Sequence, residues 1–358
     1  MAPVEFLERA ALAAVLSEAE RAGLDVEFVL IGGSFAEGLA SSTSDIDLVL
    51  VHSEARPRDA LVLRVEGKRV EVTVFSLEDY RRTTTLDRQR DTGATAYWHL
   101  DARRRLLFSR PVYGHSQHAT QLDKARLSEF GEDLLEYQQV LAFKSFSDLK
   151  SGLSDSMIED DLRVRCRTHL ERSVDLLLTS LRDYYFREKW RVARTRRTLT
   201  DDRLQLLVDP ISAMLSGRPM PWGAEFASWT RMSFLCSTIC QYVTAFSGSW
   251  PGCLTRADIS VLLSELRQQI PVGVSRQGAA YFCQTPTKAF QLTPSLANAV
   301  TLSAIGLPLE RVMQGVEDHA RWEVTQGRSA RASDAVRERL PGLLQRLGIA
   351  ADNAQGSD

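Results

Sequence analysis

Two aspartates separated by one residue stand at the start of a predicted strand. Asp45 and Asp47 flank Ile46, and the apolar run over 46–51 predicts a buried strand. Residues two apart on a strand face the same side, so both carboxylates are expected to point at one spot. Like charges held this close repel each other unless a divalent cation lies between them. The pair therefore predicts a Mg²⁺ site, because this ion prefers one or two carboxylates together with phosphate oxygens.

A glycine-serine turn precedes the aspartates. A short apolar run over 26–31 predicts a strand, Gly32-Gly33-Ser34 ends it, and a helix is expected over 34–40. Glycines let a ligand approach the backbone closely, and a helix start offers unpaired N–H groups to an anion. Gly33 and Ser34 are therefore candidate phosphate-binding residues. A phosphate cradle beside a carboxylate pair is what nucleotidyl transfer from a nucleoside triphosphate requires.

A third carboxylate follows on another predicted strand, over 70–75. Glu71 alternates with Val70 and Val72, so it faces away from their side and is expected to reach the same cleft. It is either a further metal ligand or a general base that takes the proton of an acceptor hydroxyl. Two alternatives remain. Ser44 and Asp45 could merely form a turn while Glu71 is a solvated strand residue, or the site could be an inactive copy.

The combined pattern resembles the polymerase-β-type nucleotidyltransferase superfamily. A hydrophobic strand, a Gly-Ser pair, a further glycine and Ser-Asp-hydrophobic-Asp-Leu make up that pattern. The residues that fill its places are Gly33, Ser34, Gly38, Ser44, Asp45, Asp47 and Leu48. The Glu-Val-Thr-Val around Glu71 is most similar to the aminoglycoside adenylyltransferase branch, in which the third acid can act as the base.

This resemblance covers roughly a third of the chain. It implies that Gly33 and Ser34 bind the triphosphate, that Asp45 and Asp47 hold Mg²⁺, and that Glu71 completes the catalytic and metal-binding set. It also implies ATP, as its Mg²⁺ complex, as the donor. Related enzymes have a helical domain that closes over the nucleotide and supplies a cation to the phosphates. Lys189 is the first candidate for that cation and Arg194 the second, although the basic stretch 185–197 could equally be a solvated helix end.

The elements around these residues predict an α+β fold. A helix over 5–22 and a hairpin with strands over 61–65 and 70–75 complete a mixed-sheet nucleotidyltransferase domain over 1–120. A helical bundle domain that completes the cleft is expected over 121–250. A small, mainly helical region with two short strands follows over 251–349, and 350–358 is a predicted disordered tail.

The composition is that of an ordinary globular protein. The chain has 358 residues, a net charge of −2 and 44% hydrophobic residues, so there is no global attraction to nucleic acid or to an anionic membrane. No signal peptide or membrane span is evident, and a cytoplasmic protein without a membrane partner is expected. Cys236 and Cys240 are predicted core residues. Trp98 is also predicted to be core, and the adjacent arginines 103–105 are predicted to lie on the surface.

The expected activity is Mg²⁺-dependent transfer of a nucleoside monophosphate, AMP from ATP, to a hydroxyl of an unidentified small acceptor such as an antibiotic or metabolite. Acidic residues over 155–161 favour a small cationic acceptor, whereas the basic stretch 187–197 favours a protein or RNA acceptor. A nucleotide-sensing regulator without turnover is a third hypothesis.

Overall fold

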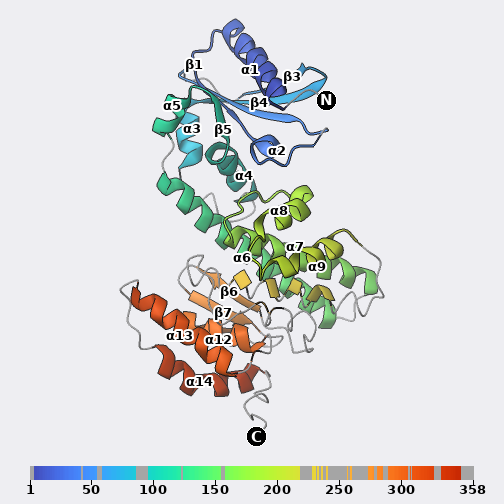
Figure 1. Cartoon of the computed structure of the whole chain (residues 1–358), viewed down its shortest axis with the longest axis vertical. Coiled ribbons are helices and arrows are strands. Elements are labelled where there is room, and N and C mark those ends of the chain that lie inside the picture. The colour runs from blue at the N-terminus through green and yellow to red at the C-terminus, as the bar shows by residue number, and fades with distance from the viewer. Residues whose placement is uncertain are drawn as a thin grey trace. The chain divides into compact units, whose positions relative to one another are not determined.

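The computed structural model of the chain forms two compact units, residues 1–134 and 135–358, and the division falls inside helix α6, Lys124–Ser154 (Figure 1). The residues it describes are 4–41, 43–54, 59–85, 96–121, 124–154, 158–217, 228–230, 232, 233, 235, 236, 239, 240, 256, 259, 273–277, 280–284, 289–304, 307, 309–325 and 332–347. The predicted tail over 350–358 lies outside them.

The first unit is built on a mixed five-stranded sheet. Its strands are β1 (Val26–Ile31), β2 (Ile46–His52), β3 (Asp59–Val65), β4 (Lys68–Ser76) and β5 (Arg110–Tyr113), in the order β3-β4-β2-β1-β5. The β2–β4 pair is parallel and the other pairs are antiparallel. The predicted strands and hairpin are confirmed. β5 was not predicted, because four residues that include a proline give no apolar run.

Side chains alternate between the two faces of this sheet along each strand, and the apolar ones form one hydrophobic cluster on each face. Helix α1 (Val4–Arg21) covers one face, where it meets the valines, leucines and isoleucines on one side of β1, β2 and β4. Helices α3 (Leu77–Thr84) and α4 (Ala96–Leu107) supply Tyr80 and Leu106 to the cluster on the other face. Figure 1 shows α1 above the strands and α3 and α4 below them.

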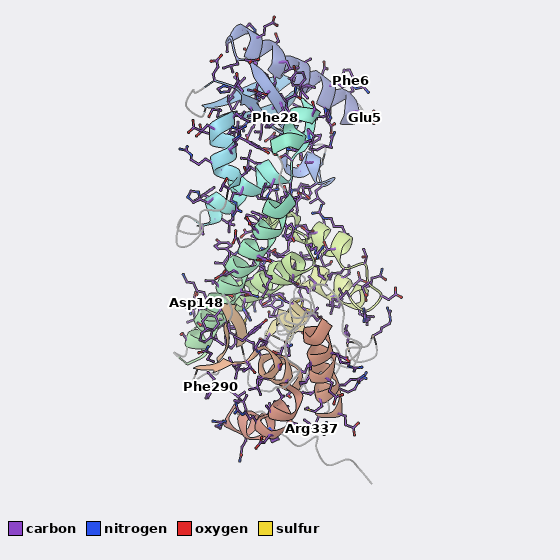
Figure 2. The ribbon with its side chains drawn as sticks, turned by 90° about the vertical axis from the view of Figure 1, so that its left-hand side faces the viewer. Glu5, Phe6, Phe28, Asp148, Phe290 and Arg337 are labelled. Atoms are coloured by element: carbon purple, nitrogen blue, oxygen red, sulfur yellow. The ribbon has the colours of Figure 1, made fainter. Side chains whose placement is uncertain are left out.

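Phe28 of β1 illustrates the second face. Its ring is fully buried and makes edge contacts with Tyr80 of α3 and with His118 of α5 (His115–Gln121). In Figure 2, Phe28 lies inside this unit, whereas Phe6 lies on the outer side of α1, where 49% of its surface is exposed. The sheet is therefore a middle layer with helices on both sides.

Local signals explain where elements begin and turn. Glu66 and Gly67 have φ angles of 50° and 75°, which makes the two-residue hairpin turn between β3 and β4 compatible with the twist of the strands. Ser76 ends β4 and caps α3, because its hydroxyl accepts a hydrogen bond from the Asp79 N–H at 3.0 Å.

The second unit is mostly helical and also contains a small sheet. Its first elements are the end of α6, α7 (Glu159–Ser180), the 3₁₀ turn η1 (Glu188–Trp190), α8 (Arg191–Thr198) and α9 (Gln205–Leu215). An antiparallel sheet of β6 (Gly273–Gln277), β7 (Ala280–Gln284) and β8 (Ala289–Leu292) follows, with α12 (Pro294–Ala304), α13 (Leu309–Thr325) and α14 (Ala332–Leu347). The mixed-sheet domain followed by a mainly helical region confirms the predicted fold class.

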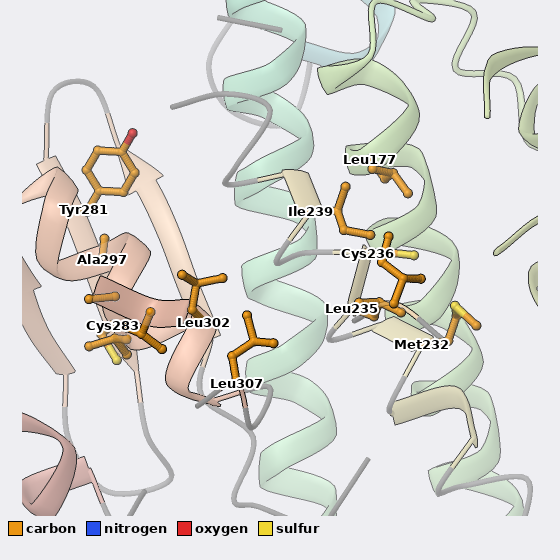
Figure 3. Packing of buried hydrophobic residues seen from close by; sticks show 14 of the residues in the cluster. Leu177, Met232, Leu235, Cys236, Ile239, Tyr281, Cys283, Ala297, Leu302 and Leu307 are labelled. Carbon is orange, nitrogen blue, oxygen red and sulfur yellow. The ribbon is translucent and has the colours of Figure 1, made fainter. Parts of the chain in front are cut away.

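One hydrophobic cluster runs through the second unit. It joins Leu177 of α7 and the buried Cys236 to Tyr281 and Cys283 of β7 and Leu302 of α12, as Figure 3 shows. The predicted core position of Cys236 is confirmed, and burial raises the pKa of its thiol. The division into regions 121–250 and 251–349 stays a prediction. Within the described residues, no helix is long and apolar enough to cross a membrane.

Candidate active site

The parallel β2–β4 pairing places Asp47 and Glu71 next to each other. The two residues are direct partners in the strand register. Both strands turn these side chains to the face covered by α3 and α4, because Ile46, Val70 and Val72 belong to the cluster under α1. Asp47 and Glu71 line one pocket, which also contains Gly32, Gly33, Leu48, Val49, Thr73, Arg105 and Ser109.

Gly33 holds the backbone against the Asp47 carboxylate. Its φ is +60°, in the left-handed region, and a Cβ built there would lie only 1.9 Å from Asp47 Oδ2. The preceding residue fixes the same contact, since the Gly32 N–H donates to the Asp47 carbonyl oxygen at 2.8 Å. Gly33, which is predicted to let a ligand approach the backbone, lets the Asp47 carboxylate approach it in the structure.

The loop before β2 is ordered by its own hydroxyls. The Ser41 N–H donates to Ser44 Oγ at 2.8 Å, and the Ser44 N–H donates to the Ser41 carbonyl oxygen at 3.1 Å. Asp45 follows this turn and is exposed, but it is not among the residues that line the pocket. Ser34 lies in the short helix α2 (Gly33–Ala36), is buried, and does not line the pocket either.

Glu71 forms an ion pair along its own strand. Arg69 Nη2 lies 2.8 Å from Glu71 Oε1, and both side chains are about half exposed. Residues 69 and 71 face the same side of β4, so Arg69 pairs with a carboxylate that lines the pocket without lining the pocket itself.

Arg105 is a pocket residue that sequence reasoning placed on the general surface. Its Nε donates to Asp101 Oδ2 at 3.0 Å, and its Nη1 lies 3.9 Å from Asp47 Oδ1, which is beyond hydrogen-bonding distance. Burial lowers the pKa of Arg105, but the charges of Asp101, Asp47 and Glu71 outweigh this effect and raise the pKa above its usual value. The sequence did contain one signal for this position: Asp101 and Arg105 are four residues apart, a spacing typical of an ion pair on one helix face.

For three further residues of α4, the observed burial is the opposite of what the sequence predicts, which is a core position for Trp98 and surface positions for Arg103 and Arg104. Trp98 is 68% exposed, whereas Arg103 and Arg104 are buried. Arg103 is paired with Asp133 at 2.9 Å and its guanidinium lies over the ring of Phe130, so ion pairing and stacking compensate its burial.

The site fits a divalent cation that is shared with phosphate oxygens. Asp47 and Glu71 supply the one or two carboxylates that Mg²⁺ uses in such sites. Within the described part of the chain, however, no group of three or more acidic, histidine or cysteine side chains is placed to hold a metal ion. Asp47 and Glu71 line the pocket and Asp45 does not, so the predicted metal-binding set of Asp45, Asp47 and Glu71 stays a prediction.

The two cations predicted in the second unit differ in exposure. Lys189 lies exposed on η1, with its Nζ 5.5 Å from the ring centre of Trp190. Arg194 is fully buried and forms ion pairs with Asp175 at 3.0 Å and Asp183 at 3.1 Å. Because its donors are used inside the unit, Arg194 does not fit the predicted phosphate-binding role.

Residues 12–137 match the family model described as a nucleotidyltransferase domain. The match covers the five-stranded sheet and its pocket. It supports the polymerase-β-type superfamily for this part of the chain, and nucleotidyl transfer from a nucleoside triphosphate as its general activity. A search of curated proteins found no match to this chain.

Proposed function

We propose that the chain transfers a nucleoside monophosphate, AMP from ATP, to a hydroxyl group of a small-molecule acceptor in a Mg²⁺-dependent reaction. The observation that carries the proposal is the pairing of Asp47 and Glu71 in one pocket, with Gly33 packed against Asp47. The nucleotidyltransferase match of residues 12–137 supports the same chemistry.

In the proposed reaction, an acceptor oxygen attacks the α-phosphorus, the bond from that phosphorus to the bridging oxygen breaks, and pyrophosphate leaves with the bond electrons. Asp47 and Asp45, with Glu71, would hold Mg²⁺, which neutralises charge on the phosphates when it is bound. Gly33 and Ser34 would bind the triphosphate, and the acceptor proton passes to Glu71 if this residue is the base. The exposed Lys189 stays a candidate for a further phosphate-binding cation.

The charges of the second unit favour a small acceptor over a nucleic acid. In the basic stretch over 187–197, Arg191 and Arg194 are buried in ion pairs, and Arg197 is paired with Asp183. These cations are therefore not free to contact phosphates of RNA. Asp160 and Asp161, by contrast, are exposed in the first turn of α7, where they suit a cationic molecule, whereas Glu159 beside them is paired with Arg163 at 3.0 Å.

The first experiment incubates the purified chain with each α-labelled nucleoside triphosphate, with and without Mg²⁺. An aminoglycoside panel, the protein itself and RNA serve as acceptors. Metal-dependent label on a small acceptor, absent in Asp47→Asn, is the expected result. Asp25→Asn is the matched control, because Asp25 is an exposed carboxylate just before β1 that bonds Ser53. Label on protein or RNA alone would shift the acceptor class, and binding without any transfer would favour a sensor.

Glu71→Gln separates the two roles of the third carboxylate. As a general base, Glu71 is dispensable for Mg²⁺–ATP binding, so the variant should bind normally and lose transfer. As a metal ligand, it contributes to both, so binding measured by calorimetry should weaken together with transfer.

A further inference from the structure

Helix α4 is buried on almost every side except one. Seven of its twelve residues are buried, including Arg103 and Arg104. The side chains at Trp98, Ala102 and Arg105 lie within about 60° of one another around the helix axis, since an α-helix has 3.6 residues per turn. This stripe contains the 68% exposed Trp98 and the 37% exposed Arg105 side chain.

One end of the stripe belongs to the active site. Arg105 lines the pocket beside Asp47 and Glu71, and its Nε is held by Asp101, whose side chain is 7% exposed. The Nη1 atom forms a long ion pair with Asp47 at 3.9 Å, beyond hydrogen-bonding distance, so among the described residues this carboxylate makes no hydrogen bond with it. A planar guanidinium fixed in this way suits an oligophosphate, which accepts paired hydrogen bonds.

The other end of the stripe offers an aromatic surface. Trp98 lies seven residues before Arg105, about 10 Å along the helix, comparable with the span from the phosphates to the base of a nucleoside triphosphate. Ala102 lies between them and leaves room for a sugar. The ring of Tyr97 packs edge-on against Trp98, with centroids 5.3 Å apart, and thereby restricts the orientation of the indole.

We propose that α4 presents a nucleotide-binding stripe, in which Arg105 binds the triphosphate and Trp98 stacks on the nucleobase of the donor. The assignment rests on the proposed function, because the donor must enter the pocket that contains Asp47. Stacking on an indole does not discriminate among bases by hydrogen bonding, so this contact adds affinity for the nucleobase without selecting one.

The test compares binding of two ligands to the full chain by titration calorimetry in Mg²⁺: ATP, which has a base, and inorganic tripolyphosphate, which has none. Trp98→Ala is expected to weaken ATP binding roughly tenfold and to leave tripolyphosphate binding unchanged, because one base stack is lost. Trp98→Phe should retain most of the ATP affinity. Arg105→Ala should weaken both ligands roughly tenfold, because both contain the triphosphate.

Phe6→Ala is the matched control, since Phe6 is an exposed aromatic residue on the opposite face of the sheet and should leave both affinities unchanged. Equal ATP affinity in Trp98→Ala and the unaltered chain would overturn the assignment of the base, even if transfer to an acceptor fell. Unchanged tripolyphosphate binding in Arg105→Ala would overturn the assignment of the phosphates. Absence of ATP binding by the unaltered chain would instead refute the proposed function, and this inference with it.

Discussion

Replacing Gly33 by alanine should damage the site more than it damages the fold. Any alanine at a φ near +60° is strained by about 1–2 kcal/mol. At Gly33 the new Cβ would also lie 1.9 Å from Asp47 Oδ2, so the carboxylate would have to retreat by about 1.5 Å to reach the 3.4 Å of an ordinary contact. A displacement of about 1 Å in a catalytic group can cost about 100-fold in rate.

Gly67→Ala supplies the matched control. Gly67 has a φ of +75°, and nothing lies within 4 Å of a Cβ built there, so this variant has the backbone strain without the clash. Urea unfolding should show a loss of about 1–2 kcal/mol for Gly67→Ala and about 2–4 kcal/mol for Gly33→Ala. Mg²⁺–ATP affinity and transfer should fall only in the latter. If both variants bind and turn over nucleotide equally, the contact between Gly33 and Asp47 does not position the carboxylate.

Three further outcomes concern stability. Arg194→Met should cost about 3–5 kcal/mol in urea unfolding, because it leaves the buried aspartates at 175 and 183 without one of their cations. Burial lowers the pKa of His169 to about 4, so the unfolded chain binds more protons between pH 6.5 and 4 and stability should fall by about 3 kcal/mol as the pH drops through that window. His169→Gln should remove that part of the pH dependence, and an unchanged profile would contradict the assignment. Ser76→Ala should cost about 1 kcal/mol through loss of the α3 cap, measured by thermal unfolding.

The sequence predicts the first unit well where one physical signal dominates. The apolar runs that end at Ile31 and begin at Ile46 are short, rich in β-branched residues and bounded by turn residues, which favours buried strands, and their predicted bounds lie within a residue of those of β1 and β2. The faces of Asp47 and Glu71 also followed from alternation alone. Their adjacency did not, because it depends on the non-local choice of β4 as the parallel neighbour of β2.

The errors on α4 and at β6 have a different cause. Charge was expected to mark the surface and an indole the core, but Arg103 pairs with Asp133 and stacks on Phe130 inside the unit, while Trp98 is 68% exposed. Burial of a charge depends on tertiary partners that a sequence pattern does not name. β6 was missed because Gly273–Gln277 contains one large apolar residue, and only pairing with β7 makes it a strand.

Which side chains of β4 line the pocket depends on the register between β2 and β4. β2 and β4 remain in parallel register over seven consecutive pairs, from Ile46 with Val70 to His52 with Ser76. A shift of β4 by a single residue would exchange its two sides, sending Glu71 among the valines and leucines under α1 and turning Val72 into the pocket. The hydrophobic layer under α1 would resist that shift, since Val70 and Val72 would leave it and the polar groups of Glu71 and Thr73 would be buried in it. The core that stabilises the sheet therefore also determines which side chain of β4 lines the pocket beside Asp47, and deletion of one β4 residue before Glu71 should remove Glu71 from the pocket while leaving it in the chain.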